Sequence, residues 1–357
     1  MDKQLLDLYS DYLISSFSQT TVTGLSRLLD GAISHDRITN LLAESRFTDQ
    51  DLWKLTKKDF REIESKEGVL IFDDTIQEKP YTDENEIICY HFDHTKGRNV
   101  KGINLLNCVY YNQETTLPFG FDIIRKEEDF VDPKTGKTKR RSKITKNELL
   151  RKQLQRTGKN KLQYSYILTD IWFSSQENIN YIKQTLDKDC IMGFKSNRKV
   201  ALSKKDKLQG NFVSISSLSM KSAELLQVYV QGIEFPMLLS KQVFTNKEAS
   251  SGELYLICSD LTLSYQEIHT IYQKRWKVEE FHKAIKSNTG FAKSPTRIER
   301  TQSNHFFASI YAFVKMERLR LKNHLNHFSL QSKLYLNAIK TAFQELNKMQ
   351  QVQKLYT

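Results

Sequence analysis

The sequence predicts an α/β protein that has helical regions at both ends and a β-rich insertion. Apolar residues recur at helical spacing over the first ~65 residues, and again over about 303–322 and 330–350. Strand-like segments rich in Val, Ile and aromatic residues lie between these regions. A strand at 164–170, a helical pattern at 175–188 and a strand at 190–195 form a β-α-β unit, which implies parallel strands.

The N-terminal region is predicted to be a helical DNA-binding domain. A helix at about 23–29 stops at Gly31, and the next helix begins at Ser34, a good N-cap residue. Helix, glycine turn and helix make up the helix-turn-helix pattern. This pattern would place His35, Arg37 and Asn40 at the start of a recognition helix. An ordinary helical hairpin is the alternative, because many such hairpins share the pattern.

The α/β part is expected to start with a buried strand at 69–72, which runs directly into Asp73 and Asp74. Segments near 87–92, 102–112 and 117–125 then suggest an antiparallel meander. The predicted organisation is a helical domain at 1–65, the first part of the core at 66–195, a β-rich insertion at 196–250, the second part of the core at 251–295, and a helical region at 296–357.

The chain is strongly basic. Its 357 residues carry 54 Lys and Arg against 42 Asp and Glu, a formal net charge of +12, and such a chain usually binds a polyanion. The stretch 134–161 contains twelve Lys or Arg and one acid, Glu148. We expect the Lys and Arg residues of this stretch to contact DNA phosphates. The alternative is a solvated loop and helix face. Those singled out are Lys139, Arg140, Arg141 and Lys143.

Several classes of protein are disfavoured. The apolar runs are too short to span a membrane and the N-terminus lacks a secretion signal, so we expect a cytoplasmic protein. The four cysteines lie singly in apolar runs and are expected to be reduced and mostly buried. No glycine-rich phosphate loop is present, so ATP binding is not expected. Trp172 and Trp276 are expected in the core.

A helix expected from Ser264 to about Asn288 carries a candidate catalytic side chain. Ser264 and Glu267 form a capping box at its start. Five polar residues at spacings of 3, 4, 3 and 4 share one stripe of this helix: Tyr272, Arg275, Glu279, His282 and Lys286. The alternative is a surface salt bridge between Arg275 and Glu279, which would stabilise the helix by only about 0.2–0.5 kcal/mol.

Two aspartates at expected strand ends favour a catalytic role for Glu279 over a surface salt bridge. Asp74 follows the first core strand, and Asp170 ends the strand of the β-α-β unit. Neighbouring carboxylates repel each other, and they persist together mainly where a divalent cation binds between them. With Glu279 they would offer hard oxygen ligands for Mg²⁺ or Mn²⁺. Two such ions about 4 Å apart can activate a nucleophile and stabilise the leaving oxygen of a phosphodiester.

The segment 272–286 resembles a signature of DDE insertion-sequence transposases, Tyr-(2)-Arg-(3)-Glu-(6)-Lys. Tyr272, Arg275, Glu279 and Lys286 match its four positions. The group with this signature moves DNA by cut and paste, and its RNase H-like fold contains a β-rich insertion domain. Asp74, followed by Thr, resembles the first aspartate of the family, and Asp170 resembles the second.

The resemblance implies a role for each of these residues. Asp74, Asp170 and Glu279 would ligate two Mg²⁺ or Mn²⁺ ions, while Tyr272, Arg275 and Lys286 would contact phosphates at the transposon end. Asp73 is a rival for the first position. Strand alternation places the two aspartates on opposite faces, and Asp74 is preferred because it adjoins Thr75. The implied partners are double-stranded DNA of the element ends and the target, bound by a homodimer at a bacterial-type nucleoid.

The expected function is therefore DNA transposition. The protein would cut at the ends of an element and join the freed 3′-hydroxyl to target DNA. One alternative is a metal-dependent nuclease or resolvase on the same core, which cuts but does not join. The other is a domesticated DNA-binding protein without catalysis, which the presence of all three acids disfavours.

Overall fold

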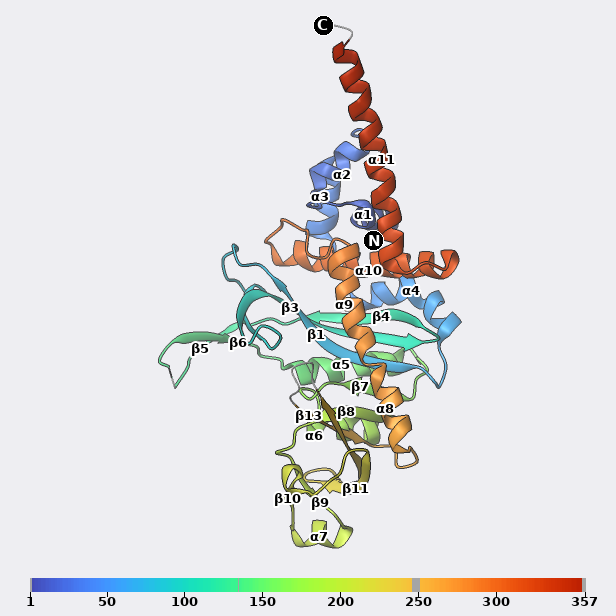
Figure 1. Cartoon of the computed structure of the whole chain (residues 1–357). Helices are drawn as coiled ribbons and strands as arrows, with labels where there is room; N and C mark the ends of the chain where they lie inside the picture. Colours follow the sequence, from blue (N-terminus) through green and yellow to red (C-terminus); the bar gives the residue numbers. More distant parts are fainter. Residues whose placement is uncertain (1, 134, 246–250, 355–357) are drawn as a thin grey trace. The chain divides into compact units, whose positions relative to one another are not determined.

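A computed structural model describes residues 2–133, 135–245 and 251–354 of the chain (Figure 1). The parts of the expected basic stretch, β-rich insertion and C-terminal region that fall on 134, 246–250 and 355–357 lie outside the described residues. The chain forms two units, one made of residues 1–56 and 280–357 and the other of residues 57–279.

The larger unit is built on one mixed sheet (Figure 1). Its strands are β1 (Val69–Glu78), β2 (Cys89–Asp93), β3 (Arg98–Asn112), β4 (Thr115–Ile123), β7 (Tyr166–Thr169), β8 (Asp189–Phe194), β9 (Lys199–Ala201), β10 (Val213–Ser214), β11 (Glu224–Val230), β12 (Met237–Thr245) and β13 (Ser251–Cys258). Their order is β10-β9-β11-β12-β13-β8-β7-β1-β3-β2, and β4 pairs with β3.

The strand directions confirm the α/β class and the RNase H-like core. β1, β7 and β8 run parallel to one another, as the β-α-β pattern predicts. β3 pairs antiparallel with β1, β2 and β4, which is the expected meander. The strands of the segment 196–245 continue the same sheet beyond β13. Within the sheet β1 lies between β7 and β3, and its residues 69–72 have no exposed surface.

Helices of the larger unit include α5 (Lys146–Lys159), α6 (Gln176–Asn180), α7 (Lys204–Gln209) and α8 (Tyr265–Gln273). The expected capping boxes are present at both Thr145 with Glu148 and Ser264 with Glu267. α5 packs on β3 and β4, and α8 packs on β8. A short hairpin, β5 (Glu128–Val131) with β6 (Thr138–Arg141), forms a separate two-stranded sheet.

The smaller unit is helical. It contains α1 (Lys3–Ser15), α2 (Val22–Leu28), α3 (His35–Glu44), α10 (Glu299–Asn323) and α11 (His327–Lys354), whereas α4 (Asp49–Ile63) and α9 (Trp276–Asn288) span the boundary between the units. The two expected N-terminal helices are confirmed: Gly31, with φ of +76°, lies between them, and the Ser34 hydroxyl caps α3.

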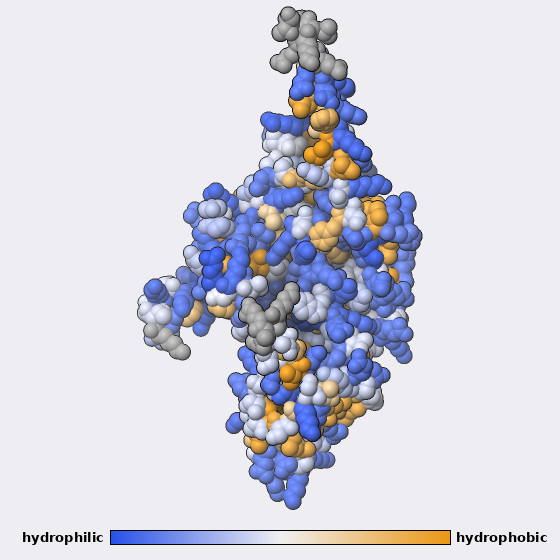
Figure 2. All heavy atoms as spheres, in the orientation of Figure 1, coloured by the Kyte–Doolittle hydropathy of each residue, from blue (hydrophilic) through white to orange (hydrophobic). Residues whose placement is uncertain are grey.

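Segments from both ends of the sequence share one core in this unit. α10 packs on α1 and α3. The Tyr9 hydroxyl lies 2.9 Å from Nδ1 of the buried His305. Exposed apolar side chains follow α11 among hydrophilic ones (Figure 2), and they include Leu336, Ile339, Phe343 and Leu346. In the described part of the chain, no helix is both long and apolar enough to cross a membrane.

Candidate active site

The two adjacent aspartates lie inside β1. The expectation that the strand ends at Asp74 is wrong, because β3 pairs with β1 as far as Glu78. On its other side, β1 pairs with β7 only as far as Phe72, which lies opposite Thr169. The next residue on each strand is an aspartate, Asp73 on β1 and Asp170 after β7. The register therefore brings these two residues to the same edge of the parallel pairing.

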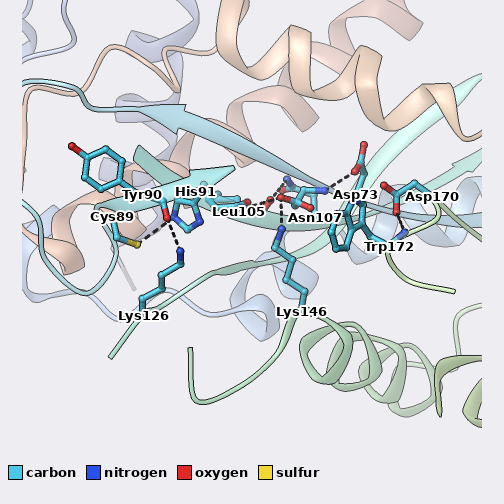
Figure 3. Close-up of polar contacts among 12 residues, drawn as sticks. Asp73, Cys89, Tyr90, His91, Leu105, Asn107, Lys126, Lys146, Asp170 and Trp172 are labelled. Carbon is cyan, nitrogen blue, oxygen red and sulfur yellow. Dashed lines mark hydrogen bonds and ion pairs between the residues drawn. The ribbon is translucent and has the colours of Figure 1, made fainter. Parts of the chain in front are cut away.

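Figure 3 shows the Asp73 and Asp170 side chains at this edge, and the pKa values of both are raised. Burial, together with the negative charges of Asp170 and Asp74, raises the pKa of Asp73 to about 7. Burial also raises the pKa of Asp170, and the charge of Asp74 adds to this effect, whereas the backbone N–H of Trp172 opposes it. These shifts mean that keeping Asp73 and Asp170 ionised costs free energy.

Arg275 connects Asp73 with Glu279. Its guanidinium lies 3.8 Å from Asp73 and donates a 2.7 Å hydrogen bond to Oε1 of Glu279. Burial alone would lower the pKa of Arg275, but the charges around it, including those of Glu279 and Asp73, raise it. The Arg275 guanidinium thus links Glu279 to Asp73. Arg275 and Glu279 are both half-buried rather than on the open surface.

Asp74 has different neighbours from Asp73. Its Oδ2 accepts 2.8 Å hydrogen bonds from the Asn104 amide and from the Lys146 ammonium. Figure 3 shows Lys146 reaching up to the strand from the start of α5. Of the two rival aspartates, Asp73 is therefore the one that pairs with Arg275, and Asp74 pairs with Lys146.

The helix expected over 264–288 is interrupted at Lys274 and Arg275. The N–H groups of Lys274 and Arg275 bond to carbonyls three residues back, and those of Lys277 and Val278 do the same. This tight turn separates α8 from α9, so the expected single stripe is broken. Tyr272 nevertheless stays beside Arg275, whose guanidinium carbon lies 6.0 Å from its ring centroid, and its hydroxyl donates a 3.2 Å hydrogen bond to the Thr169 carbonyl, next to Asp170.

Three other expected DNA-contacting residues belong to the smaller unit. Lys286, on α9, belongs to the smaller unit and is half-buried. In the same unit Arg37 is exposed and pairs with Asp2 at 3.0 Å, and Asn40 is exposed as well.

The basic residues of the β5–β6 hairpin, and Lys143 just after it, form ion pairs with acidic residues. Arg140 lies 3.3 Å from Asp129, Arg141 lies 3.0 Å from Glu128, and Lys143 lies 3.8 Å from Glu127. Lys139 pairs with Asp132. These acids directly precede the stretch 134–161, so a charge count over that stretch misses them.

The expectation that Trp172 and Trp276 belong to the core is wrong. Their exposed fractions are 54% and 58%. Trp172 follows the end of β7 and Trp276 starts α9, and a cation lies over each indole: Lys195 at 5.0 Å and Arg275 at 5.1 Å from the ring centroids. By contrast, all four cysteines are buried and reduced, as expected.

The chemistry of the donor set fits a divalent metal ion. In the described residues, no three His, Cys, Asp or Glu side chains already form a metal-binding group. However, Asp73 and Asp170 are hard oxygen donors whose pKa values are raised by burial and by the charges of neighbouring carboxylates, and a bound cation would offset both effects. Glu279 could add a third oxygen on exchanging its bond to Arg275.

The chain belongs to a family of DDE superfamily endonucleases, whose model matches residues 2–209. The match includes Asp73, Asp74 and Asp170, and ends before Glu279. No curated protein matches.

Two solved structures show weak similarity. The Drosophila P element transposase strand transfer complex is 13% identical over 49% of this chain and 35% of that chain, with a TM-score of 0.27. Kluyveromyces polysporus Argonaute with a guide RNA is 13% identical over 72% of this chain and 31% of that chain, with a TM-score of 0.22. The chain thus spans about a third of the length of each.

Proposed function

We propose that this protein is a DDE transposase that cleaves DNA at the ends of an element and joins the 3′-hydroxyl to target DNA. The observation that carries the proposal is the meeting of Asp73, Asp170 and the Arg275–Glu279 pair at one edge of the sheet. Membership of the endonuclease family supports the cleavage step. The match of 272–286 to the transposase signature supports the joining step.

We assign the metal-binding role to Asp73, Asp170 and Glu279, in place of Asp74 at the first position. Two Mg²⁺ or Mn²⁺ ions, when bound, would supply a hydroxide nucleophile and stabilise the leaving oxygen. Arg275 holds Glu279 before a metal binds and is then available to a DNA phosphate. Lys146 neutralises Asp74 on the other side of the strand, which lowers the charge repulsion within the cluster.

The first test is nicking of a supercoiled plasmid in Mg²⁺ or Mn²⁺. Asp73→Asn, Asp170→Asn and Glu279→Gln should each lower cleavage by several orders of magnitude, because each removes a charged ligand of the metal pair. Asp83→Asn, which changes an exposed acid, is the matched control. If Glu279 only pairs with Arg275, Glu279→Gln would instead lower stability by about 0.3–0.5 kcal/mol and leave cleavage intact.

Asp74→Asn decides between the adjacent aspartates. If Asp73 is the ligand, Asp74→Asn should retain most of the cleavage and Asp73→Asn should retain almost none. The opposite result would return the first position to Asp74. A thermal melt of each variant shows whether a reduction in cleavage reflects unfolding.

Joining distinguishes a transposase from a nuclease or resolvase on the same core. The substrate is a DNA fragment that carries the gene with its flanking repeats, and the readout is its insertion into a target plasmid. Cleavage without insertion would favour the nuclease. We further propose that a homodimer binds the two element ends, and sedimentation of the protein–DNA complex tests this stoichiometry.

A further inference from the structure

A group of exposed aromatic rings lies beside the candidate active site in the larger unit. Trp172 follows Asp170 by two residues, and its backbone N–H donates a 2.9 Å hydrogen bond to Oδ1 of that aspartate (Figure 3). The His94 ring lies 5.1 Å from the Trp172 ring, and Phe92 lies 4.7 Å from His94. We call Trp172, His94 and Phe92 the aromatic platform.

The aromatic platform is not explained by packing. Trp172 and Phe92 are 54% and 51% exposed, so neither contributes a buried side chain to the core. The three residues come from two separate parts of the chain, the end of β2 with the turn after it and the loop after β7. Lys195, the first residue after β8, places its ammonium 5.0 Å from the Trp172 ring centroid.

Exposed aromatic rings beside a cation are suited to bind a nucleotide that has left the base stack. An aromatic face next to a cation binds a base by stacking and its phosphate by charge, and it does so for any base sequence. Paired bases inside a duplex offer no free face, so the ligand must be unpaired. Two residues span at most about 7 Å of chain, so the platform can reach only nucleotides close to the phosphate held at Asp170.

We propose that Trp172, with His94 and Lys195, binds one unpaired nucleobase of the DNA strand next to the phosphodiester at the carboxylate cluster. The inference rests on the proposed function, because it assumes that DNA occupies this cluster. The base takes the place of the flexible Lys195 side chain on the indole, and the ammonium group moves to the adjoining phosphate. Fraying at a cleavage site is thereby favoured.

The test compares binding of two DNA probes in EDTA, so that no cleavage occurs. One probe is a blunt duplex, and the other is the same duplex with a short 3′ overhang that contains 2-aminopurine. Wild-type protein should bind the overhang probe more tightly and quench its fluorescence by stacking. Trp172→Ala should weaken overhang binding by about ten- to a hundredfold, with blunt-duplex binding changed less than about twofold.

Two further variants exclude a structural explanation. Trp172→Phe keeps a stacking ring and should retain part of the preference and the quenching. Tyr81→Ala removes an aromatic residue that is 95% exposed elsewhere in the same unit, and it should change neither probe. The inference is overturned if wild-type protein does not prefer the overhang, or if Trp172→Ala leaves that preference unchanged or weakens both probes equally.

Failure of this inference can be told apart from failure of the proposed function. Plasmid cleavage by a protein that does not prefer the overhang would overturn the base site alone. A protein that binds the overhang through Trp172 but does not cleave in Mg²⁺ or Mn²⁺ would overturn the catalytic assignment alone.

Discussion

Tyr272 is the residue at which the family resemblance and the geometry suggest different roles. The resemblance implies a contact with a DNA phosphate, whereas the structure directs the hydroxyl to the backbone carbonyl of Thr169. Burial raises the pKa of Tyr272 to about 12, so this hydroxyl stays a neutral donor at physiological pH. We therefore expect Tyr272 to act as a positioning residue that holds the strand end before Asp170.

Tyr272→Phe separates these roles. A positioning residue next to a metal ligand should raise the Mg²⁺ concentration needed for cleavage by about 10- to 100-fold and leave the salt dependence of DNA binding unchanged. A phosphate contact should instead lower the magnitude of the salt slope by an amount below about one unit, with no change in the Mg²⁺ requirement. Titrations of Mg²⁺ and of salt on the same variant give both readouts.

Gly193 allows this contact by its lack of a side chain. A Cβ atom there would lie 3.1 Å from the Ile171 backbone nitrogen and 3.2 Å from the Tyr272 hydroxyl. Gly193→Ala should therefore displace the loop that carries Asp170 and lower cleavage by about tenfold or more. Gly158→Ala is the matched control, since nothing lies within 4 Å of its Cβ and the site is in α5. It should raise stability by about 0.5–1 kcal/mol and keep full cleavage.

At the scale of elements, variants of the β5–β6 hairpin test whether basic residues that are ion-paired with acidic ones still bind DNA. Neutralising Lys139, Arg140, Arg141 and Lys143 should lower the magnitude of the salt slope by about 0.9 for each DNA phosphate that the hairpin no longer neutralises. The reciprocal variant converts their partners Glu127, Glu128, Asp129 and Asp132 to amides. It should raise DNA affinity, because these acidic side chains then no longer compete with DNA phosphates for the Lys and Arg side chains. If neither variant changes the slope or the affinity, the hairpin does not contact DNA.

Local sequence rules predicted where helices begin better than where β1 and α8 end. The capping boxes at Thr145 and Ser264 and the N-cap at Ser34 depend on residues within one helical turn, and all three are present. The end of β1 and the turn at Lys274 were missed. The first depends on β3, which pairs with both aspartates from more than 25 residues away. The second involves an Arg275 side chain that contacts Asp73, about 200 residues earlier in the chain.

The candidate site was predictable as a set of residue types but not as a set of contacts. Strand acids with Tyr272, Arg275 and Glu279 in one signature pointed to the part of the sheet where Arg275 lies between Asp73 and Glu279. The pairing of Arg275 with Asp73 and of Lys146 with Asp74 depends on which face each strand residue takes in the folded sheet. The exposure of Trp172 likewise follows from its position after β7, which composition does not reveal.

At the scale of the whole molecule, the sequence suggested separate helical regions at the two ends. The structure instead joins residues 1–56 with 280–357 in one unit. Such a union needs contacts between residues some 300 positions apart, such as Tyr9 with His305, and local periodicity carries no information about them. The proposed catalytic acids all lie in the other unit, 57–279.

The pH dependence of folding provides a test of the core around β2 that does not depend on catalysis. Burial and the positive charges of Lys126 and Lys146 lower the pKa of His91 to about 3, and its Nε2 lies 3.3 Å from the Cys89 sulfur. In the unfolded chain the same histidine has a pKa of about 6.5. Between these two values the unfolded state binds the extra proton, so the free energy of unfolding falls as pH falls.

His91→Gln should remove this contribution. Urea unfolding of wild-type protein between about pH 6.5 and pH 5 should include a decrease of about 1 kcal/mol per pH unit from His91, and the stability of the variant should fall more gradually by that amount. His35→Gln, which changes an exposed histidine, is the control and should keep the wild-type slope. Equal slopes for His91→Gln and wild type would mean that His91 is protonated in the folded state, and the buried, neutral environment assigned to it would then be incorrect.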